Sequence, residues 1–378
     1  MKVYFDNAAT TAVCDESIDA MITVMKEKYG NPSSTHYMGR QAAELRELAR
    51  KNVATVIGAA PESIYFTSGG TEANNWAILA LAKIQSGKNK HIITSETEHS
   101  AVLEPIKKLE TIGWEITYLT PDKTGRIPAD SFSSALRDDT AFASIMTVNN
   151  ETGAINPISD YCAEIKHRRL STLFHTDAVQ AFCKIPITAK NLGADLIAMS
   201  AHKMHGPKGV GALYAKQGLN LPPTQFGGGQ ENGKRPGTEG LPAIVGFGEA
   251  ARIGFPEQQK TFSTVQKLRK HIIEKLAQDI PEALLIGEGD SPFLLSISIP
   301  GHKSEVLMSF LEAEGICISK SSACKKGARS RVLEAMKLKN DIIDGALRIS
   351  FSKNNTTEEA DYFVATLKKA VTTLLKPL

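Results

Sequence analysis

Lys203 stands in the stretch SAHKMHGPKGV, between His202 and His205 and shortly after an apolar run. Three functions are open to such a lysine. It can be a surface charge, it can lie beside a His-x-x-His metal site, or its amine can act as a covalent catalyst. Two histidines three residues apart need a further ligand, and no acidic residue or cysteine stands at a recognisable spacing from them. The spacing therefore disfavours the metal site.

The turn in YFTSGGTEANN has the composition of a phosphate-binding loop. Gly69, Gly70 and Thr71 stand where a predicted strand gives way to a predicted helix. Free backbone N–H groups and the positive end of the helix dipole suit a phosphate there, and glycine permits its close approach. A turn that merely needs flexible residues is the alternative. The segment is not a Walker P-loop, because no G-K-[ST] follows.

Two charged residues stand in or directly after apolar runs that predict strands. Asp177 follows the run in TLFHTDA, where an unpaired carboxylate would be costly. Its partner can be a basic side chain or the protonated nitrogen of a heterocyclic ring. Arg348, in GALRISFS, needs a carboxylate for a fork-shaped pair, and that carboxylate can belong to the protein or to a substrate.

Two further residues are candidates for chemistry. His99, in SETEHSAV, lies at a predicted strand-to-helix junction, where it can be a helix cap, a surface group or a catalyst. Cys324, in ISKSSACKKGARS, has small residues and lysines around it, which favour a reactive thiolate over a buried structural cysteine. Cys317, between Ile316 and Ile318, is predicted to be buried and inert.

Together these groups indicate one chemistry. A lysine amine condenses with an aldehyde to form a Schiff base, and a pyridinium ring then acts as an electron sink for a carbanion. A phosphate cradle, a buried acid for the ring nitrogen and a histidine complete such a site. The sequence therefore predicts an enzyme that uses pyridoxal 5'-phosphate, with Lys203 as the covalent catalyst.

An α/β fold is expected to bring these residues together. Short β-rich runs alternate with helix-like segments such as 71–86 and 100–112, which predicts βαβ units around a mostly parallel sheet flanked by helices. Ligands collect outside the carboxyl ends of the strands of such sheets. Polar, chemically capable residues follow most of the predicted strands, which lie at 63–69, 91–96, 115–120, 141–148, 172–178 and 196–201.

The chain is predicted to form two domains. Its 378 residues exceed what one hydrophobic core holds on average. After about residue 250 the pattern changes to helix-like segments at 258–278 and 356–375 with short strands around FLLSISIP. We expect a large cofactor-binding domain at 14–250 and a smaller α+β domain made of 1–13 and 251–378, to which Cys324 belongs.

Composition and charge exclude several classes of protein. The 44 basic and 41 acidic residues are interspersed and leave a net charge of +3, which argues against nucleic acid as the main partner. No apolar run approaches the ~20 residues of a membrane span, and MKVYFDNAATT lacks the apolar core of a signal peptide. We expect a cytoplasmic protein. The five cysteines contain no C-x-x-C and fit neither a disulfide framework nor a zinc site.

The chain resembles the cysteine desulfurases of the NifS/IscS type, in the class V aminotransferase group of fold-type I pyridoxal phosphate enzymes. The resemblance covers nearly the whole chain, and it rests on many motifs that occur in the same order as in the family. These motifs are YFDNAATT, GNPSSTHYMGR, TSGGTEANN, TEHSAV, VNNETGAINPI, HTDAVQ, SAHKMHGPKGVGALY, GGGQENGKRPGTE and SSAC.

The resemblance implies roles around the cofactor ring. Lys203 would hold the cofactor covalently and remove the Cα proton of the substrate. His99 would stack on the ring, Asp177 would pair with the ring nitrogen, and Gln180 would touch the phenolic oxygen. The residues implied for the phosphate are Gly70, Thr71, Ser200, His202 and, from the partner subunit of a homodimer, Thr238.

The resemblance also implies the substrate and the products. Asn150 and Arg348 would bind the carboxylate of L-cysteine. Cys324 would attack the substrate's sulfur, leaving alanine and an enzyme persulfide for a sulfur-accepting protein such as an iron–sulfur scaffold. The residues after Cys324 depart from the small hydroxyl types usual in the family and read KKGARSR, which bears on the acceptor.

Three alternatives stay open. Selenocysteine lyase uses the same chemistry, and a class V aminotransferase has no need of Cys324. A non-catalytic sulfur-carrier scaffold would need neither Lys203 nor Asp177.

Overall fold

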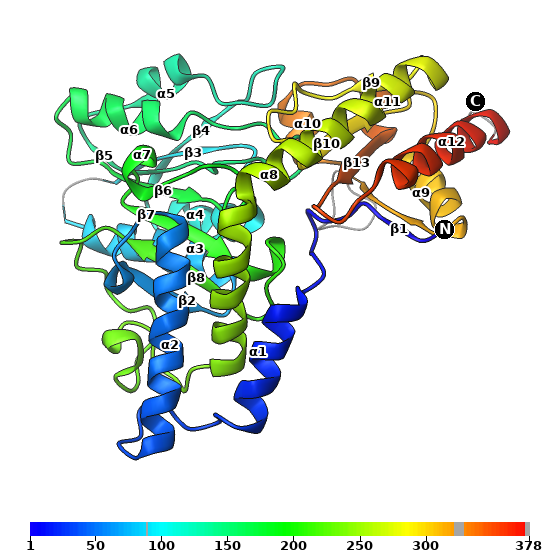
Figure 1. Ribbon diagram of the computed structural model, residues 1–378. Coiled ribbons are helices and arrows are strands. Elements are labelled where there is room, and N and C mark those ends of the chain that lie inside the picture. Colours follow the sequence, from blue (N-terminus) through cyan, green and yellow to red (C-terminus); the bar gives the residue numbers. More distant parts are fainter. Residues whose placement is uncertain (88–89, 321–328, 375–378) are drawn as a thin grey trace.

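The computed structural model describes residues 1–87, 90–320 and 329–374. Within these residues, the largest sheet has seven strands in the order β2-β8-β7-β6-β5-β3-β4 (Figure 1). The strands are β2 (Ile64–Thr67), β3 (His91–Ser95), β4 (Glu115–Leu119), β5 (Thr140–Ser144), β6 (Leu173–Asp177), β7 (Leu196–Ser200) and β8 (Gly211–Ala215). β8 runs antiparallel to both neighbours, whereas the pairs from β7 to β4 are parallel. The prediction of a mostly parallel sheet is confirmed.

Helices cover both faces of this sheet, which explains why its strands, apart from the edge strand β4, are almost entirely buried. Neighbouring residues of one strand enter different cores: Ile92 packs in one and Ile93 in the other. The first face carries α3 (Gly70–Ile84) and α4 (Ser100–Glu110). The second face carries α2 (Tyr37–Val56), α5 (Ala129–Ala135), α6 (Ile158–His167), α7 (Ala189–Leu192) and the first half of α8 (Leu241–Asp279).

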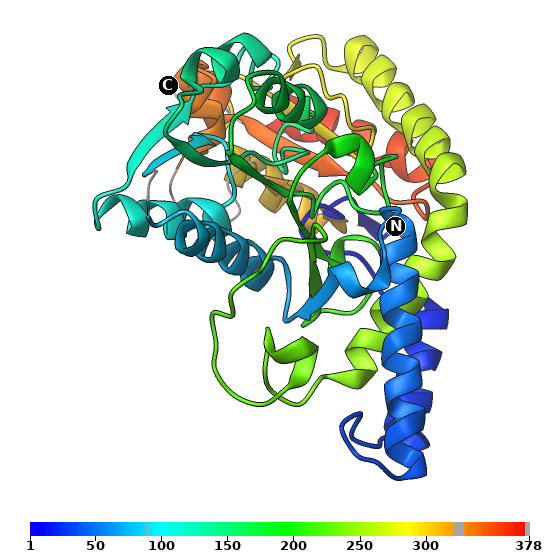
Figure 2. The ribbon, with the colours of Figure 1, turned by 90° about the vertical axis from the view of Figure 1, so that its left-hand side faces the viewer.

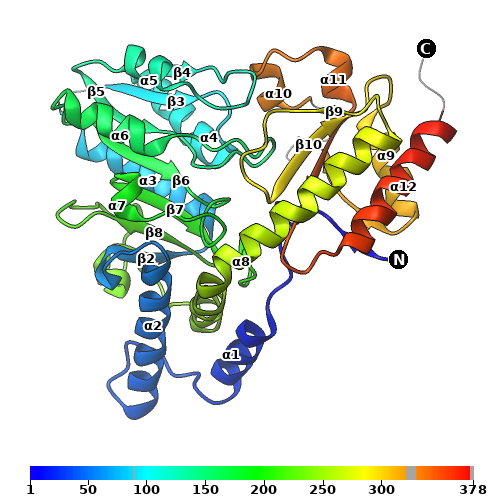
Figure 3. The same ribbon diagram turned by 45° about the horizontal axis from the view of Figure 1, so that its top comes forward.

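A smaller antiparallel sheet has the order β12-β13-β10-β9 and its own core. Figure 3 shows its strands β9 and β10 to one side of the large sheet. Its strands are β12 (Ser319–Lys320), β13 (Ala346–Ser350), β10 (Leu294–Ser298) and β9 (Leu284–Leu285). The nearby helices are α9 (Ser304–Ala313), α10 (Arg331–Ala335), α11 (Asn340–Asp344) and α12 (Thr357–Thr373). β1 (Val3–Tyr4) pairs in parallel with β11 (Ile316–Cys317), and Val3 and Phe5 enter this second core.

Helix α8 contributes to both cores. Its first half packs on α1 (Asp15–Lys26) and α2, beside which it lies in Figure 2, and its second half packs on α12. Ile244 and Phe247 belong to the core of the large sheet, whereas Leu268 and Ile272 belong to the second core. The predicted boundary after residue 250 thus falls inside a helix, and the division into two domains stays a prediction.

None of the helices in the described ranges has the length and apolar character that crossing a bilayer requires.

Candidate active site

Four chain segments bring the predicted residues to one edge of the large sheet. Asp177 and Ser200 are the last residues of the adjacent parallel strands β6 and β7. The short helix η2 (Ala201–Lys203) follows β7 directly and carries Lys203. Gly70 and His99 lie just beyond β2 and β3, so all of these residues follow the carboxyl ends of strands, where ligands collect in such folds.

The amine of Lys203 points to the N-terminal segment. Its Nζ donates to the carbonyl oxygens of Ala8 and Ala9, the latter at 2.7 Å. Gln180 Nε2 donates to the same Ala8 oxygen at 2.9 Å. A residue predicted to anchor the cofactor and one predicted to touch its ring therefore share one acceptor.

Asp177 is buried and accepts hydrogen bonds from amides. Its Oδ2 accepts from Asn74 Nδ2 at 2.7 Å and its Oδ1 from the Val179 N–H at 2.9 Å. Burial raises the pKa of the carboxyl, while the hydrogen bonds from Val179 and Asn74 and the charges of His99 and Lys203 lower it. A cationic ligand atom at this carboxylate would favour its ionised form.

His99 is the N-cap of α4. Its Nδ1 accepts from the Ala101 N–H at 3.1 Å, which places the proton of the neutral ring on Nε2. Burial lowers the pKa of His99, and the charge of Asp177 opposes that shift. The capping bond fixes the ring, so the cap and the catalytic interpretations of this histidine are compatible.

The start of α3 has the chemical features of an anion site. Gly69, its N-cap, has φ 155° and ψ −178°, a conformation that glycine alone adopts readily. A Cβ on Gly70 would lie 2.7 Å from Val179 Cγ2, and 3.6 Å from the Cβ of Ser200. Ser200 Oγ is buried without a hydrogen-bond partner among the described residues. An unpaired hydroxyl beside the free N–H groups of a helix start fits a phosphate, and Thr71 follows at the exposed side.

His202, two residues after Ser200, contacts the N-terminal segment. Its Nδ1 lies 3.3 Å from Thr10 Oγ1, and burial lowers its pKa to about 4. His205 Nδ1 instead lies 2.9 Å from the carbonyl oxygen of Ala12. Across the part of the chain that the structure describes, no group of three or more His, Cys, Asp or Glu could hold a metal ion.

Arg348 joins the second sheet to the large one. Its Nη2 pairs with Asp6 Oδ1 at 2.9 Å, and its Nη1 donates to the carbonyl oxygen of Asn150 at 3.0 Å. The side chain is 2% exposed, yet its Nε lacks a hydrogen-bond partner within the described residues. Arg348 therefore forms an ion pair with a carboxylate of the protein itself, and its Nε is left as a donor for another acceptor.

Two of the expected site residues, Cys324 and Thr238, are not found beside Lys203 among the described residues. Cys324 lies outside the described residues. Thr238 is exposed and borders a different cavity, next to Met25 and Tyr29, rather than the one lined by Lys203. Within a single chain, Thr238 does not complete the site.

The prediction that Cys317 is buried is wrong. Cys317 is exposed, because it stands on the two-residue strand β11, where successive side chains point to opposite sides. Ile316 and Ile318 take the two buried positions.

Two contributors to the site were not predicted from the sequence. Asn74 holds Asp177, and its Oδ1 is buried without a partner in the described chain. Lys184 Nζ donates to Gln180 Oε1 at 3.0 Å, and burial lowers the pKa of this lysine to about 7. The sequence signals are the asparagine pair in TEANN and the lysine four residues after Gln180, but neither signal identifies the group that the side chain binds.

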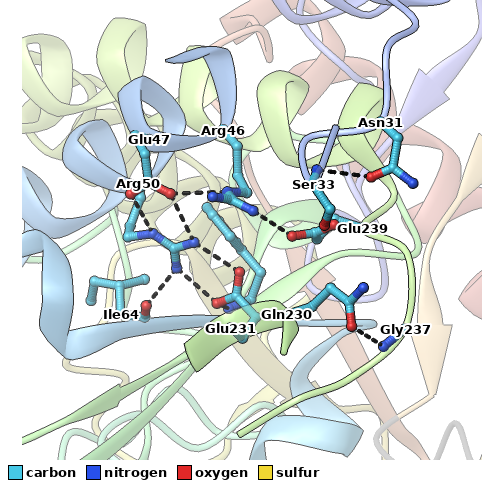
Figure 4. A network of polar contacts seen from close by, with 11 residues as sticks. Asn31, Ser33, Arg46, Glu47, Arg50, Ile64, Gln230, Glu231, Gly237 and Glu239 are labelled. Atoms are coloured by element: carbon cyan, nitrogen blue, oxygen red, sulfur yellow. Dashed lines mark hydrogen bonds and ion pairs between the residues drawn. The ribbon is translucent and has the colours of Figure 1, made fainter. Parts of the chain in front are cut away.

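The loop that carries Thr238 is held by a polar network on α2 (Figure 4). Arg50 binds Glu231 with two hydrogen bonds of 2.7 and 2.8 Å and also donates to the carbonyl oxygen of Ile64. Glu231 Oε2 accepts from the Phe66 N–H at 2.9 Å. Arg46 pairs with Glu239 farther along the loop.

Replacing Arg50 by methionine is expected to lower the free energy of unfolding by about 3–5 kcal/mol, because Glu231 would stay buried without its partner. Urea denaturation of the two proteins measures the difference. Arg137→Met is the control, because Arg137 makes exposed ion pairs with Glu115 and Asp139, which contribute little. Equal destabilisation by both variants would contradict the assignment of Arg50 as a structural anchor.

Comparison with known proteins identifies a family and several relatives of this chain. The family model for aminotransferase class-V matches residues 3–363. A cysteine desulfurase IscS of Methanosarcina thermophila is 43% identical over 363 residues, which cover 95% of this chain and 89% of that protein. A solved NifS-like protein is 39% identical with a TM-score of 0.94, over 99% of this chain and 100% of that one. A solved structure described as SspA in complex with cysteine is 33% identical with a TM-score of 0.81, over 94% and 100% of the two chains.

Proposed function

Because the chain belongs to the aminotransferase class-V family, and within it to the cysteine desulfurases of the NifS/IscS type, we propose that it removes sulfur from L-cysteine. The products are L-alanine and a persulfide on Cys324. The observation that carries the proposal is the convergence of Lys203, Asp177 and the unpaired Ser200 hydroxyl beyond neighbouring strands.

The family depends on pyridoxal 5'-phosphate, and the residues present fit that cofactor. Lys203 would hold it covalently, Asp177 would face the ring nitrogen and His99 one face of the ring. Gln180 would donate to the phenolic oxygen. For the phosphate, the proposed residues are Gly70, Thr71, Ser200, His202 and, from the partner subunit, the equivalent of Thr238. When bound, the cofactor withdraws electrons from the Cα of the substrate.

The chain's own residues then bind the substrate and move its proton. The unpaired Nε of Arg348 and the neighbouring Asn150 support a carboxylate site at the junction of the two sheets. Lys203 would take the Cα proton of the substrate. The Cys324 thiolate attacks the sulfur, so that an S–S bond forms as the C–S bond breaks and its electron pair stays on carbon.

The decisive experiment measures sulfide and alanine released from L-cysteine in the presence of a thiol reductant. Equal amounts of the two products are expected, from a protein with visible cofactor absorbance. Conversion of L-cysteine to its keto acid with a keto-acid acceptor would favour the aminotransferase. Activity confined to selenocysteine would favour the lyase, and a colourless protein without turnover would favour the silent scaffold.

We also propose a homodimer with two composite sites. Ile18, Ile22 and Met25 are 41%, 38% and 54% exposed and recur at helical spacing on α1. Tyr29, 68% exposed, continues this apolar surface toward the cavity that Thr238 borders. A second subunit that covers this surface would bring Thr238 to the neighbouring cofactor phosphate, and a closed two-fold dimer makes the exchange mutual.

The composite site can be tested with hybrid dimers. Mixing Thr238→Ala subunits with Lys203→Ala subunits gives hybrids in which one site has both native residues. At limiting cofactor, we expect the mixture to be clearly more active than either variant alone, with about half the wild-type activity per hybrid dimer. No recovery, despite subunit exchange demonstrated by mass spectrometry, would rule out shared sites.

The persulfide sulfur would pass to an acceptor protein, and an iron–sulfur scaffold is the acceptor that we propose. The named relative of the IscS type supports this role. The cytoplasmic location stays a prediction.

A further inference from the structure

Thr238 stands between two residues that its own subunit holds in place. The N–H of Gly237 donates to Gln230 Oε1 at 3.1 Å. The Glu239 side chain, 3% exposed, accepts from Arg46 Nη1. Thr238 itself is exposed. The loop therefore presents one free hydroxyl residue from a fixed stretch of backbone.

The beginning of the same loop is anchored more deeply. Glu231 forms the buried pair with Arg50 and lies in the short helix η3 (Gln230–Gly233). Glu231 and Asn232 have φ of 48° and 57°, which side-chain-bearing residues rarely adopt. Such strain persists only where the surroundings enforce it, and it is found mostly where a residue must be presented with precision.

Both anchors come from one face of one helix. Arg46 and Arg50 are four residues apart on α2, so their side chains lie one above the other (Figure 4). Glu47, between them in sequence, accepts hydrogen bonds from both guanidinium groups. A single rigid helix thus holds the loop on either side of the segment that leads to Thr238.

We propose that Arg46 and Arg50 are positioning residues that set Thr238 for the cofactor phosphate of the partner subunit. The inference rests on the composite site proposed above and extends it from one contact residue to the α2 side chains that aim it. The pairs Arg46–Glu239 and Arg50–Glu231 act on the phosphate only through Thr238.

The test compares two ligands on the reconstituted full-length protein: pyridoxal 5'-phosphate and pyridoxal, which lacks the phosphate. Thr238→Ala is expected to weaken binding of the phosphorylated ligand about 10-fold or more, because one hydrogen bond to a charged group is lost. Binding of pyridoxal is expected to stay unchanged. The double variant Arg46→Met/Glu239→Gln removes the pair without leaving a buried charge alone. We expect it to weaken phosphorylated-ligand binding at least about 5-fold and to leave pyridoxal binding unchanged.

Three further variants separate positioning from general loosening of the fold. Adding Thr238→Ala to the double variant is expected to give no loss beyond that of Thr238→Ala alone, because the pair acts through Thr238. Arg46→Lys keeps the positive charge, so this variant is expected to bind pyridoxal 5'-phosphate more tightly than the double variant and less tightly than the wild-type protein. Arg252→Met/Glu249→Gln, which removes an exposed guanidinium–carboxylate pair of α8, is the matched control without effect on either ligand.

The outcomes distinguish the inference from its premise. If Thr238→Ala leaves the ratio of the two affinities unchanged, the composite site is wrong and the inference is overturned with it. A second outcome is that Thr238→Ala changes the ratio of the two affinities while Arg46→Met/Glu239→Gln leaves that ratio at the wild-type value. In that case the composite site stands and the positioning role of Arg46 is wrong. A loss of affinity for both ligands would also overturn the inference, because it would report a general structural defect.

Discussion

Lys203→Ala is expected to reduce the release of sulfide and alanine from L-cysteine by at least about 10⁴-fold, because one substitution would remove both the proposed covalent attachment and the proposed base. The position supports both roles. Lys203 ends the short helix after β7, and its Nζ is within hydrogen-bonding distance of two backbone carbonyl oxygens. Alanine would leave Asp177 and Ser200 unchanged, so the variant is expected to bind the cofactor noncovalently.

Hydride reduction of the wild-type protein followed by peptide mapping measures the attachment directly. The cofactor is expected on the peptide that contains Lys203. Lys184 is the informative competitor, because it lines the same cavity and burial lowers its pKa to about 7, which favours the neutral form of its amine. Labelling at Lys184 would overturn the assignment. Lys208→Ala, at an exposed position of the same stretch, is the control expected to keep activity.

The edge of the sheet where the site lies could be predicted from the sequence because its residues follow apolar runs. Ser200 ends β7, whose first four residues, LIAM, form a continuous apolar segment, and Asp177 ends β6, which begins with the apolar residues Leu173 and Phe174. Parallel strands place their carboxyl ends at one edge, and no long-range contact has to be known to group the residues that follow them.

Helix and strand boundaries were harder to predict where packing overrides local preference. The sequence predicts a helix at 258–278, whereas α8 begins at Leu241. Glycines in the first half of α8 lower helix propensity, but a Cβ at Gly248 would lie 2.4 Å from Ala49 Cα, so glycine permits the close contact with α2. β8 was missed because its five residues, GALYA, begin in a glycine-rich turn.

The side chains that support the site could not be predicted, because their partners are distant in sequence. Asn74 and Asp177 are separated by 103 residues, and Arg50 and Glu231 by 181. A hydrogen-bonding side chain gives no sign of which remote group it meets until the strands and helices are placed. The position of Thr238 depends further on a second subunit, which a single chain does not contain.

Cys324→Ser is expected to abolish sulfur transfer while leaving the first half of the reaction in place. Lys203, Asp177 and the phosphate residues are unchanged, so the protein is expected to keep its colour, bind L-cysteine and respond with a change in visible absorbance. Persulfide formation is expected to fall by at least about 10³-fold, because a neutral hydroxyl is a far weaker nucleophile than a thiolate and cannot hold a persulfide. Labelled sulfur on the protein and sulfide in solution are the two quantities to measure.

Cys317→Ser is the matched control, because it makes the same chemical change at another thiol. Cys317 is exposed on β11, a strand that pairs with β1, so serine there leaves no polar group buried. Turnover is expected to stay near the wild-type value, and the free energy of unfolding is expected to change by no more than about 0.5 kcal/mol. If the Cys324→Ser protein passes sulfur to a thiol acceptor at the wild-type rate, the nucleophile is misassigned. If sulfur transfer is lost in the Cys317→Ser protein and kept in the Cys324→Ser protein, the persulfide would be assigned to Cys317 on β11.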